Sequence, residues 1–224
     1  MQEELFMDFR NAIYKIRKEL QKPLPGEKLQ YLMVPEIRVD NEIQTQERDA
    51  AVLICLIEGG NDLHIILIKR TEYDGPHSGQ ISFPGGMSKE SDRDLQETAL
   101  RETREEIGIS GDYAEILGSL SPLRIPVSNT IVYPFVAFID HEPIFITDEK
   151  EVSYLILARL RSFLDPANLK KEKWLLSGKE TEVPFFQLGS NKIWGATAMI
   201  LSEFMAIIAG SGIYAEDQSV NPDE

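Results

Sequence analysis

Two apolar, β-rich runs joined by a short turn constrain the fold of this chain more than any other feature. The runs span residues 50–58 and 63–70, and Gly59-Gly60-Asn61-Asp62 lies between them. Gly-Gly and Asn-Asp pairs are typical of hairpin turns, so the sequence predicts an antiparallel hairpin. Further β-rich segments are expected at 81–83, 113–121, 131–139 and 152–158, with a second hairpin at 173–188.

The N-terminal segment is expected to be a helix followed by an irregular arm. Apolar residues recur every three to four positions over residues 4–20, which places them on one helix face. This helix is ended by Pro23, Pro25 and Gly26, and the polar residues 27–48 are interpreted as a linker or arm. The predicted organisation is an N-terminal helix and arm at 1–45, a main domain at 46–212 and a disordered acidic tail at 213–224.

Two further helices are predicted within the main domain. One covers about 92–107, with Ser91 and Asp94 spaced as a capping box and Gly108 as its terminator. The other is the apolar segment 195–209, which is expected to pack against the sheet. The mixture of β-rich segments with helices predicts an α+β or layered α/β domain.

The charge balance limits the partners that this chain is expected to bind. Among 224 residues, 37 acidic side chains outnumber 23 basic ones, for a formal net charge of −14. Nucleic acids and anionic membranes attract positive surfaces, so neither is an expected partner. No segment approaches the ~20 apolar residues of a membrane span. The N terminus also lacks the basic start and apolar core of a signal peptide.

Cysteine and histidine usage restricts the chemistry further. The single cysteine, Cys55, cannot form an internal disulfide, which suits a reducing compartment, and its apolar surroundings predict a buried packing role. The histidines His64, His77 and His141 form no His-x-x-x-His or Cys/His pattern, so a zinc site is not expected. These features indicate a cytoplasmic protein.

Three glutamates on the helix expected at 92–107 give the strongest chemical signal. At about 100° per residue, Glu102, Glu105 and Glu106 fall within an arc of about 100° on the helix surface. Like charges at this spacing repel one another, and hard oxygen ligands that converge on one point suit Mg²⁺ or Mn²⁺. The alternative is a solvated helix face on which Arg101 forms ion pairs with the glutamates four residues away.

The sequence around this helix forms one extended pattern with the Gly85-Gly86 turn before it. It resembles the Nudix box, Gly-x5-Glu-x7-Arg-Glu-U-x-Glu-Glu-x-Gly-U, where U is an aliphatic residue. The second half is present at 101–109, with Thr103 in place of the first aliphatic residue. Asp92 replaces the first glutamate of the box, and the spacing from Gly86 to the box arginine is one residue too long.

The extra residue and the upstream segment resemble the coenzyme A pyrophosphatase branch of the Nudix hydrolases. The signature of that branch, Arg-Ser-x-x-Leu-Arg-x-His-x-Gly-Gln-Val-Ala-Phe-Pro-Gly-Gly, corresponds to residues 70–86 here. Its His-x-Gly-Gln and Phe-Pro-Gly-Gly parts match. Asp74-Gly75 replaces the Leu-Arg pair, which removes a cation that could hold a substrate phosphate. The Thr-Ala-Leu-Arg-Glu run at 98–102 and the Trp-Gly-Ala-Thr run at 194–197 also look like this branch.

The resemblance implies a Nudix-type α/β/α sandwich, with a mixed β-sheet between helices and an N-terminal helical extension. It implies that Glu102, Glu105 and Glu106 hold Mg²⁺ or Mn²⁺. Glu105 would also polarise the attacking water, and Arg101 would serve catalysis by orienting carboxylates through bidentate pairing. The expected substrate-binding residues are Arg70, Gly85 and Gly86.

Other residues keep two interpretations. His77 and Gln80 either contact the substrate or buttress their loop. Glu149 and Glu151 are candidates for a general base or an extra ligand, or else belong to a solvated acidic loop. Trp174 and Trp194 are interpreted as packing residues; the alternative, which the sequence does not indicate, is that one of them stacks on adenine.

The predicted function is metal-dependent hydrolysis of a diphosphate that joins a nucleoside to another group. The resemblance implies coenzyme A or an acyl-CoA as substrate, with 4′-phosphopantetheine and adenosine 3′,5′-bisphosphate as products. The alternatives are a pyrophosphatase for ADP-ribose, a dinucleotide or a nucleotide sugar, and a catalytically silent Nudix-like binding domain. The apolar face of the N-terminal helix either packs on its own domain or forms a homodimer contact.

Overall fold

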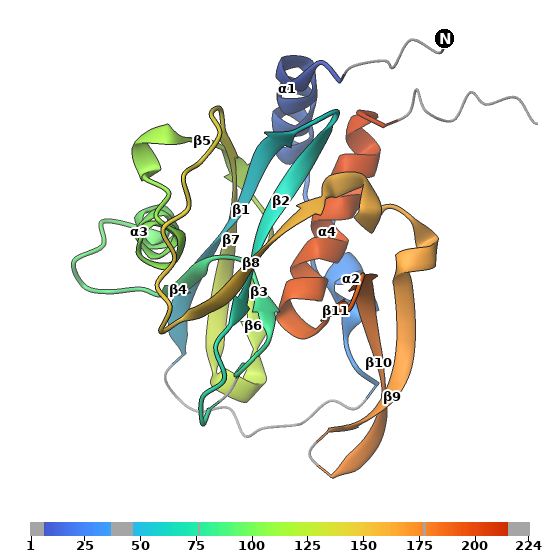
Figure 1. The fold of residues 1–224 in the computed structure, drawn as a ribbon. Helices are drawn as coiled ribbons and strands as arrows, with labels where there is room; N and C mark the ends of the chain where they lie inside the picture. The colour runs from blue at the N-terminus through green and yellow to red at the C-terminus, as the bar shows by residue number, and fades with distance from the viewer. Residues whose placement is uncertain (1–6, 37–46, 76, 177, 215–224) are drawn as a thin grey trace, which may run out of the picture.

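A mixed eight-stranded sheet forms the centre of the computed structural model, which describes residues 7–36, 47–75, 77–176 and 178–214 (Figure 1). Strand β1 (Arg48–Gly59) pairs antiparallel with β2 (Asp62–Arg70) and parallel with β7 (Thr130–Ile139). The hairpin predicted at 50–58 and 63–70 is therefore confirmed. The other strands of this sheet are β3 (Ile81–Ser82), β4 (Gly85–Met87), β5 (Ala114–Ser119), β6 (Leu123–Ile125) and β8 (Val152–Arg159).

The sequence pattern does not predict β4 and β6, since three residues are too few to show an alternation of apolar and polar side chains. Strand β4 pairs with β1, and β6 pairs with β7. Both strands form because a longer neighbour supplies the hydrogen-bonding partners.

A second, three-stranded antiparallel sheet follows β8 along the chain. It consists of β9 (Leu169–Leu176), β10 (Lys179–Leu188) and β11 (Asn191–Ile193). The hairpin predicted at 173–188 is confirmed, although it begins earlier, at Leu169. Strand β11 contacts β3 of the central sheet, so the two sheets adjoin near Ile81.

Helices cover both faces of the central sheet (Figure 1). The helices are α1 (Phe9–Leu20), α2 (Glu27–Gln30), α3 (Leu95–Ile107) and α4 (Gly195–Ser211). Leu53 and Cys55 of β1 pack in the hydrophobic cluster on the α3 side, whereas Ile54 and Leu56 pack in the cluster that contains α1 and α4. This alternation confirms the predicted α/β/α sandwich. Burial raises the pKa of the Cys55 thiol above its ordinary value, in keeping with a packing role.

The N-terminal helix packs on its own domain. Helix α1 begins at Phe9, because the Asp8 carboxylate accepts a hydrogen bond from the Asn11 backbone N–H at 3.1 Å and caps it. Its apolar stripe, centred on the fully buried Ile16, contacts α4 and β5. Residues 4–6 of the predicted helix lie outside the described residues.

The arm predicted at 27–48 is not irregular throughout. It contains α2 and a 3-10 turn at Tyr31–Met33, and it buries Gln30 and Met33 near α4. A four-residue helix is too short to show a periodic pattern, and its stability comes from tertiary contacts. Residues 37–46 of the predicted arm lie outside the described residues.

Helix α3 begins later than the sequence predicts. Asp94 has extended backbone angles, and its carboxylate accepts the Glu97 backbone N–H at 2.8 Å. The helix therefore starts at Leu95, and the predicted capping box from Ser91 is wrong. The left-handed Gly108 (φ 79°) ends the helix, which confirms the predicted terminator.

The apolar segment predicted at 195–209 is α4, which runs on to Ser211. The described residues end at Tyr214, so most of the predicted acidic tail lies beyond them. The domain boundaries at 45 and 212 stay predictions.

Candidate functional site

A cavity of about 560 Å³ lies where α3, the β3–β4 segment and the start of α4 come together; we call it the main cavity. Its acidic wall consists of Glu102, Glu105 and Glu151, and Arg70 and Lys89 line the same cavity. Its apolar wall consists of Val52, Phe83, Ile125, Val132, Ala196 and Ile200. The main cavity can therefore take a ligand with a charged part and an uncharged part.

Arg101 uses every N–H of its guanidinium group beside the main cavity. Nε and Nη2 each donate to the Asp92 carboxylate at 2.8 Å, and Nη2 also donates to the Met87 carbonyl at 3.1 Å. Nη1 donates to Glu102 at 2.5 Å and to Glu105 at 3.1 Å. Since all five N–H groups are engaged, Arg101 holds the carboxylates in place and has no donor left for a ligand.

Asp92 is the residue at which the sequence departs from the Nudix box, and the structure gives it a role. Its hydrogen bonds from the Arg101 guanidinium hold the pKa of the Asp92 carboxyl well below its usual range. The same pairing raises the pKa of Arg101. This role of Asp92 was not predicted from the sequence. An acidic residue at the position of the first glutamate of the box is the signal that could have shown it.

Glu106 differs from the other two glutamates because it is buried, at 1 % exposure. Its Oε2 accepts the Gly85 backbone N–H at 2.8 Å, and its Oε1 lies 3.3 Å from Nη1 of Arg70. Burial raises the pKa of Glu106 to about 7, and the charges of Glu151 and Glu102 act in the same direction. The predicted substrate residue Arg70 thus contacts a predicted metal ligand.

Both glycines of the turn lie close to neighbouring groups. Gly85 has φ 152°, and a Cβ there would lie 2.3 Å from the Ala51 carbonyl oxygen. A Cβ on Gly86 would lie 2.5 Å from a carboxylate oxygen of Glu102. Glycine is therefore required at Gly85, where the backbone of β1 is in the way, whereas a side chain at Gly86 would displace the Glu102 carboxylate from its present position.

Backbone hydrogen bonds place Glu151 in the site. The Asp148 N–H donates to the Glu106 carbonyl at 3.0 Å, which ties this loop to the end of α3. The Glu151 N–H donates to the Asp148 carbonyl, and the Glu151 carbonyl accepts the Thr71 N–H, both at 3.0 Å. Glu149 and Glu151 are both exposed, but only Glu151 lines the main cavity. Of the two loop glutamates, the structure brings Glu151 to the cluster.

His77 and Gln80 both line the main cavity. His77 has a left-handed backbone (φ 65°), and its Nδ1 lies 3.2 Å from Oε1 of Gln80. This contact braces the loop, and the two side chains still border the space where a ligand would lie. The arrangement is compatible with both interpretations of these residues.

Lys89 is a functional candidate that sequence reasoning missed. Its Nζ lies 3.2 Å from Oε2 of Glu105, and it lines the main cavity. Glu105 is about half exposed, so a ligand can reach both groups. A lysine between the glycine turn and the helix is the only sequence signal for this contact.

The donor chemistry of the cluster fits a hard divalent cation. Glu102, Glu105 and Glu106 offer carboxylate oxygens from neighbouring turns of α3, and Glu151 adds another carboxylate beside them. Among the described residues, no three His, Cys, Asp or Glu side chains stand ready to hold one ion. The carboxylates are paired instead with arginine and lysine side chains. To bind an ion together, they would have to turn away from these partners.

Comparison with known proteins adds sequence relatives. The NUDIX domain family model matches residues 47–178. Nudix hydrolase 22, chloroplastic, of Arabidopsis thaliana is 30% identical over 90% of this chain and 66% of that protein. Nudix hydrolase 15, mitochondrial, of the same plant is 36% identical over 68% of this chain and 55% of that protein. The mitochondrial coenzyme A diphosphatase NUDT8 of Homo sapiens is 30% identical over 77% of this chain and 74% of that protein. The chain thus spans less than two thirds of the length of the two plant relatives.

Solved structures share the fold. A MutT/nudix family protein from Enterococcus faecalis matches with a TM-score of 0.51 and 19% identity, over 91% of this chain and 74% of that one. At this identity the match supports the architecture alone. In the part of the chain that the structure describes, no helix is both long and apolar enough to cross a membrane.

Proposed function

The chain belongs to the NUDIX domain family, and from that premise we propose that it is a metal-dependent pyrophosphatase. Its substrate would be a diphosphate that joins a nucleoside to another group. The observation that carries this proposal is the acidic wall of the main cavity, where box glutamates meet Arg70 and the glycine turn. Hydrolysis of an anionic diphosphate needs a cationic side chain, such as Arg70, to bind the phosphate oxygens. It also needs carboxylates that can hold a metal ion, which neutralises the phosphate charge.

Coenzyme A or an acyl-CoA is the substrate that we propose. The likeness to human NUDT8, named a coenzyme A diphosphatase, supports this choice, as do the matching His-x-Gly-Gln and Phe-Pro-Gly-Gly segments. The apolar wall of the main cavity suits the uncharged pantetheine arm and an acyl chain. The products would be 4′-phosphopantetheine and adenosine 3′,5′-bisphosphate.

Glu102, Glu105 and Glu106 are the residues that would hold Mg²⁺ or Mn²⁺, with Glu151 as a further ligand or the general base. When bound, the ion would neutralise charge on the phosphate oxygens and make a water molecule easier to deprotonate. Arg101 would act as a positioning residue, because its engaged guanidinium keeps Glu102 and Glu105 on one side of α3. The Gly85 N–H would hold Glu106 in the same way.

The chain's own groups would divide the remaining work of hydrolysis. Arg70 lines the main cavity and would bind a phosphate oxygen of the diphosphate. Glu105 or Glu151 would accept the proton of the attacking water. Water would attack one phosphorus, the bridging P–O bond would break, and the other phosphate would leave with that oxygen.

The second candidate is the same reaction on ADP-ribose, a dinucleotide or a nucleotide sugar. Asp74-Gly75 favours it, because the Leu-Arg pair of the coenzyme A signature is missing there. Asp74 and Gly75 are exposed in the loop after β2, so no cation replaces that arginine at this point of the chain.

A substrate panel with product identification tests both candidates. Pure full-length protein is incubated with coenzyme A, ADP-ribose, NADH, diadenosine polyphosphates and nucleotide sugars, with Mg²⁺, with Mn²⁺ and with EDTA. We expect coenzyme A to be the best substrate and EDTA to abolish turnover. Faster turnover of ADP-ribose would overturn the coenzyme A assignment. No turnover of any compound would favour the silent binding domain.

A further inference from the structure

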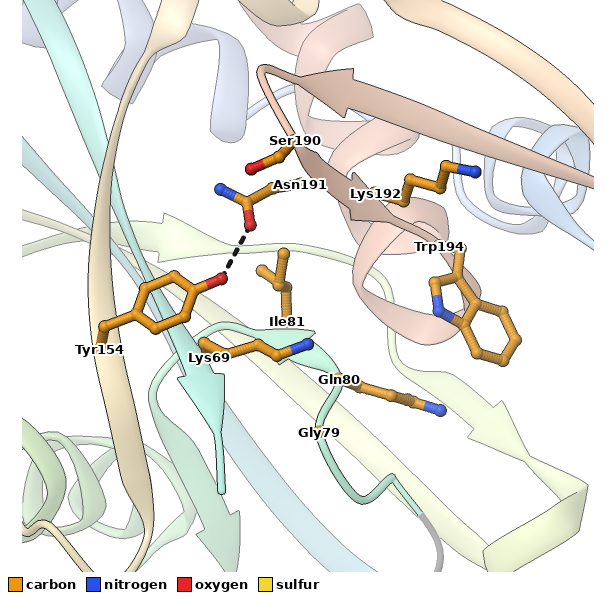
Figure 2. A pocket seen from close by; sticks show the side chains of 9 residues that line it. All are labelled: Lys69, Gly79, Gln80, Ile81, Tyr154, Ser190, Asn191, Lys192 and Trp194. Atoms are coloured by element: carbon orange, nitrogen blue, oxygen red, sulfur yellow. Dashed lines mark hydrogen bonds between the residues drawn. The ribbon is translucent and has the colours of Figure 1, made fainter. Parts of the chain in front are cut away.

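A second cavity of about 350 Å³ adjoins the main cavity and has no role in the reaction proposed above; we call it the side cavity. It lies between β2, β8 and β11, where the second sheet meets the central one. Figure 2 shows the side chains that line it, among them Lys69, Gln80, Tyr154, Asn191, Lys192 and Trp194. Gln80 also lines the main cavity, so the two spaces meet at this residue.

The side cavity is positive in a chain whose net charge is −14. Two lysines line it, and none of its lining residues is acidic. Among the described residues, the Lys69 side chain has no hydrogen-bond or ion-pair partner, so its ammonium group is available to a ligand. Successive side chains of a strand point to opposite faces, so Lys69 lines the side cavity while Arg70 lines the main cavity.

Lys192 is held in position by its neighbours. Its Nζ forms an ion pair with Glu172 and lies 5.5 Å from the ring centre of Trp174 and 5.1 Å from that of Phe185. These contacts fix the side chain on β11 beside the side cavity. Lys69 thus supplies the unpaired charge, whereas the charge of Lys192 is balanced by Glu172 and its ammonium group points away from the tip of Lys69 (Figure 2).

Trp194 adds an aromatic surface to the positive lining. Trp174 contacts it edge to face, with ring centres 5.2 Å apart, and the Trp194 side chain stays only partly buried. In Figure 2 the indole lies on the same side of the space as the tips of Lys69 and Gln80. Half-exposed aromatic rings beside cations are the usual means of holding a nucleobase and its phosphate.

We propose that the side cavity binds the purine end of a substrate whose ribose carries a phosphate separate from the diphosphate. Lys69 binds that phosphate, Asn191 and Ser190 offer further donors, and the base stacks on Trp194. The nucleotide passes Gln80, so the diphosphate lies in the main cavity and the non-nucleotide arm lies against the apolar wall. This proposal rests on the proposed function, since it assigns the two ends of that substrate.

Fluorescence of a single tryptophan tests the binding directly. The chain has two tryptophans, so full-length protein with Trp174→Phe reports on Trp194 alone. Adenosine 3′,5′-bisphosphate should quench this fluorescence at lower concentration than 4′-phosphopantetheine or inorganic phosphate. Equal affinity for inorganic phosphate or for 4′-phosphopantetheine would overturn the assignment to the nucleotide end.

Lysine variants in the Trp174→Phe protein test which side chains bind. Lys69→Met should raise the Kd for adenosine 3′,5′-bisphosphate about tenfold, and Lys69→Arg should restore most of the affinity. Lys192→Met should change the Kd less than Lys69→Met does, because the charge of Lys192 is already paired with Glu172. Lys28→Met is the matched control, since it removes an equal charge from an exposed position on α2. A Kd for Lys69→Met within twofold of the parent value, in protein with an unchanged Tm, would overturn the proposal.

Hydrolysis separates this proposal from the proposed function. The ratio of kcat/KM for coenzyme A to that for 3′-dephospho-coenzyme A should fall about tenfold in Lys69→Met and stay unchanged in Lys28→Met. If coenzyme A is hydrolysed and Lys69→Met leaves the ratio unchanged, the side cavity assignment fails alone. If coenzyme A is not hydrolysed but the bisphosphate binds in a Lys69-dependent manner, the proposed substrate fails and the side cavity assignment stands.

Discussion

Helix α4 and helix α3 each bury a glutamate, and the surroundings of the two carboxylates differ. Glu203 on α4 is fully buried and accepts three N–H groups. They come from the Gly26 backbone at 3.1 Å, Gln30 Nε2 at 2.9 Å and the Ser121 backbone at 3.3 Å. The carboxylate thereby joins the N-terminal arm and the β5–β6 loop to α4.

Glu106 on α3 is almost as buried, but it has fewer partners, and one of them is charged. It accepts one backbone N–H, from Gly85, and its other oxygen lies 3.3 Å from Arg70. Glu102 and Glu151 add negative charge nearby. A buried carboxylate that accepts hydrogen bonds from several neutral N–H groups stabilises a fold. A buried carboxylate that lies beside other carboxylates is repelled by them, and binding of a cation relieves this repulsion.

The comparison predicts its largest effect at Glu106. Glu106→Gln keeps an oxygen that can accept the Gly85 N–H and removes the charge. We expect kcat to fall more than ~100-fold. Loss of a residue that only hydrogen-bonds to a metal ligand typically lowers activity by up to ~100-fold, and loss of a ligand itself should lower it further. Steady-state kinetics with Mg²⁺ measure the loss of kcat, and the Tm from circular dichroism shows whether the fold is retained. Activity like that of the wild type would remove Glu106 from the site.

The opposite pattern is expected at Glu203. Glu203→Ala leaves one buried and two partly buried donors without their acceptor and should lower the free energy of unfolding by about 3 kcal/mol. Activity per folded molecule should not change, since Glu203 lines neither the main cavity nor the side cavity. Urea unfolding measures the loss, and Glu203→Gln, which keeps one acceptor oxygen, should lose less. A Glu203→Ala protein with unchanged stability and reduced kcat would contradict the structural role assigned to Glu203.

A smaller effect is expected in the loop before β8. Glu151→Gln should lower kcat about tenfold, because Glu151 lines the main cavity and adds charge near Glu106. Glu149→Gln is the matched control on the same loop, where the side chain is exposed. Comparable kinetics for both variants would show that neither glutamate serves the reaction.

The smallest effect concerns pH and the Asp92–Arg101 pair. Arg101 lowers the pKa of Asp92 in the folded protein below its unfolded value of about 3.9, so ionised Asp92 stabilises the fold at neutral pH. That stabilisation is lost as the pH falls below about 4. Asp92→Asn should lower the Tm by a few degrees at pH 7 and by less at pH 3. A Tm difference that is constant over this range would contradict the pairing.

Much of the architecture was predictable from local patterns. The hairpin of β1 and β2 follows from apolar runs around a glycine turn, and the α3 terminus follows from Gly108. Shorter elements were not predictable, because α2 and β4 depend on neighbours distant in sequence. The helix start was misplaced because Asp92, three residues before the helix, is held by Arg101 and lies outside the helical backbone.

The candidate site divides in the same way. A helix wheel places Glu102, Glu105 and Glu106 on one face, because their spacing is a property of the helix itself. It cannot show that Glu106 is buried against Gly85 while Glu105 stays half exposed beside Lys89. It also cannot distinguish Glu149 from Glu151, since their difference depends on the hydrogen bonds that tie this loop to the end of α3 and to Thr71.

The sequence by itself therefore determined the family, the layered fold and the carboxylate helix, because these depend on periodicity and on short-range spacing. The tertiary structure decided which glutamate is buried, which partner Arg101 binds and where Lys69, Lys192 and Trp194 meet. These features depend on contacts between segments far apart in the chain. Burial and electrostatic surroundings, which set the chemistry of each side chain, arise only when those segments pack together.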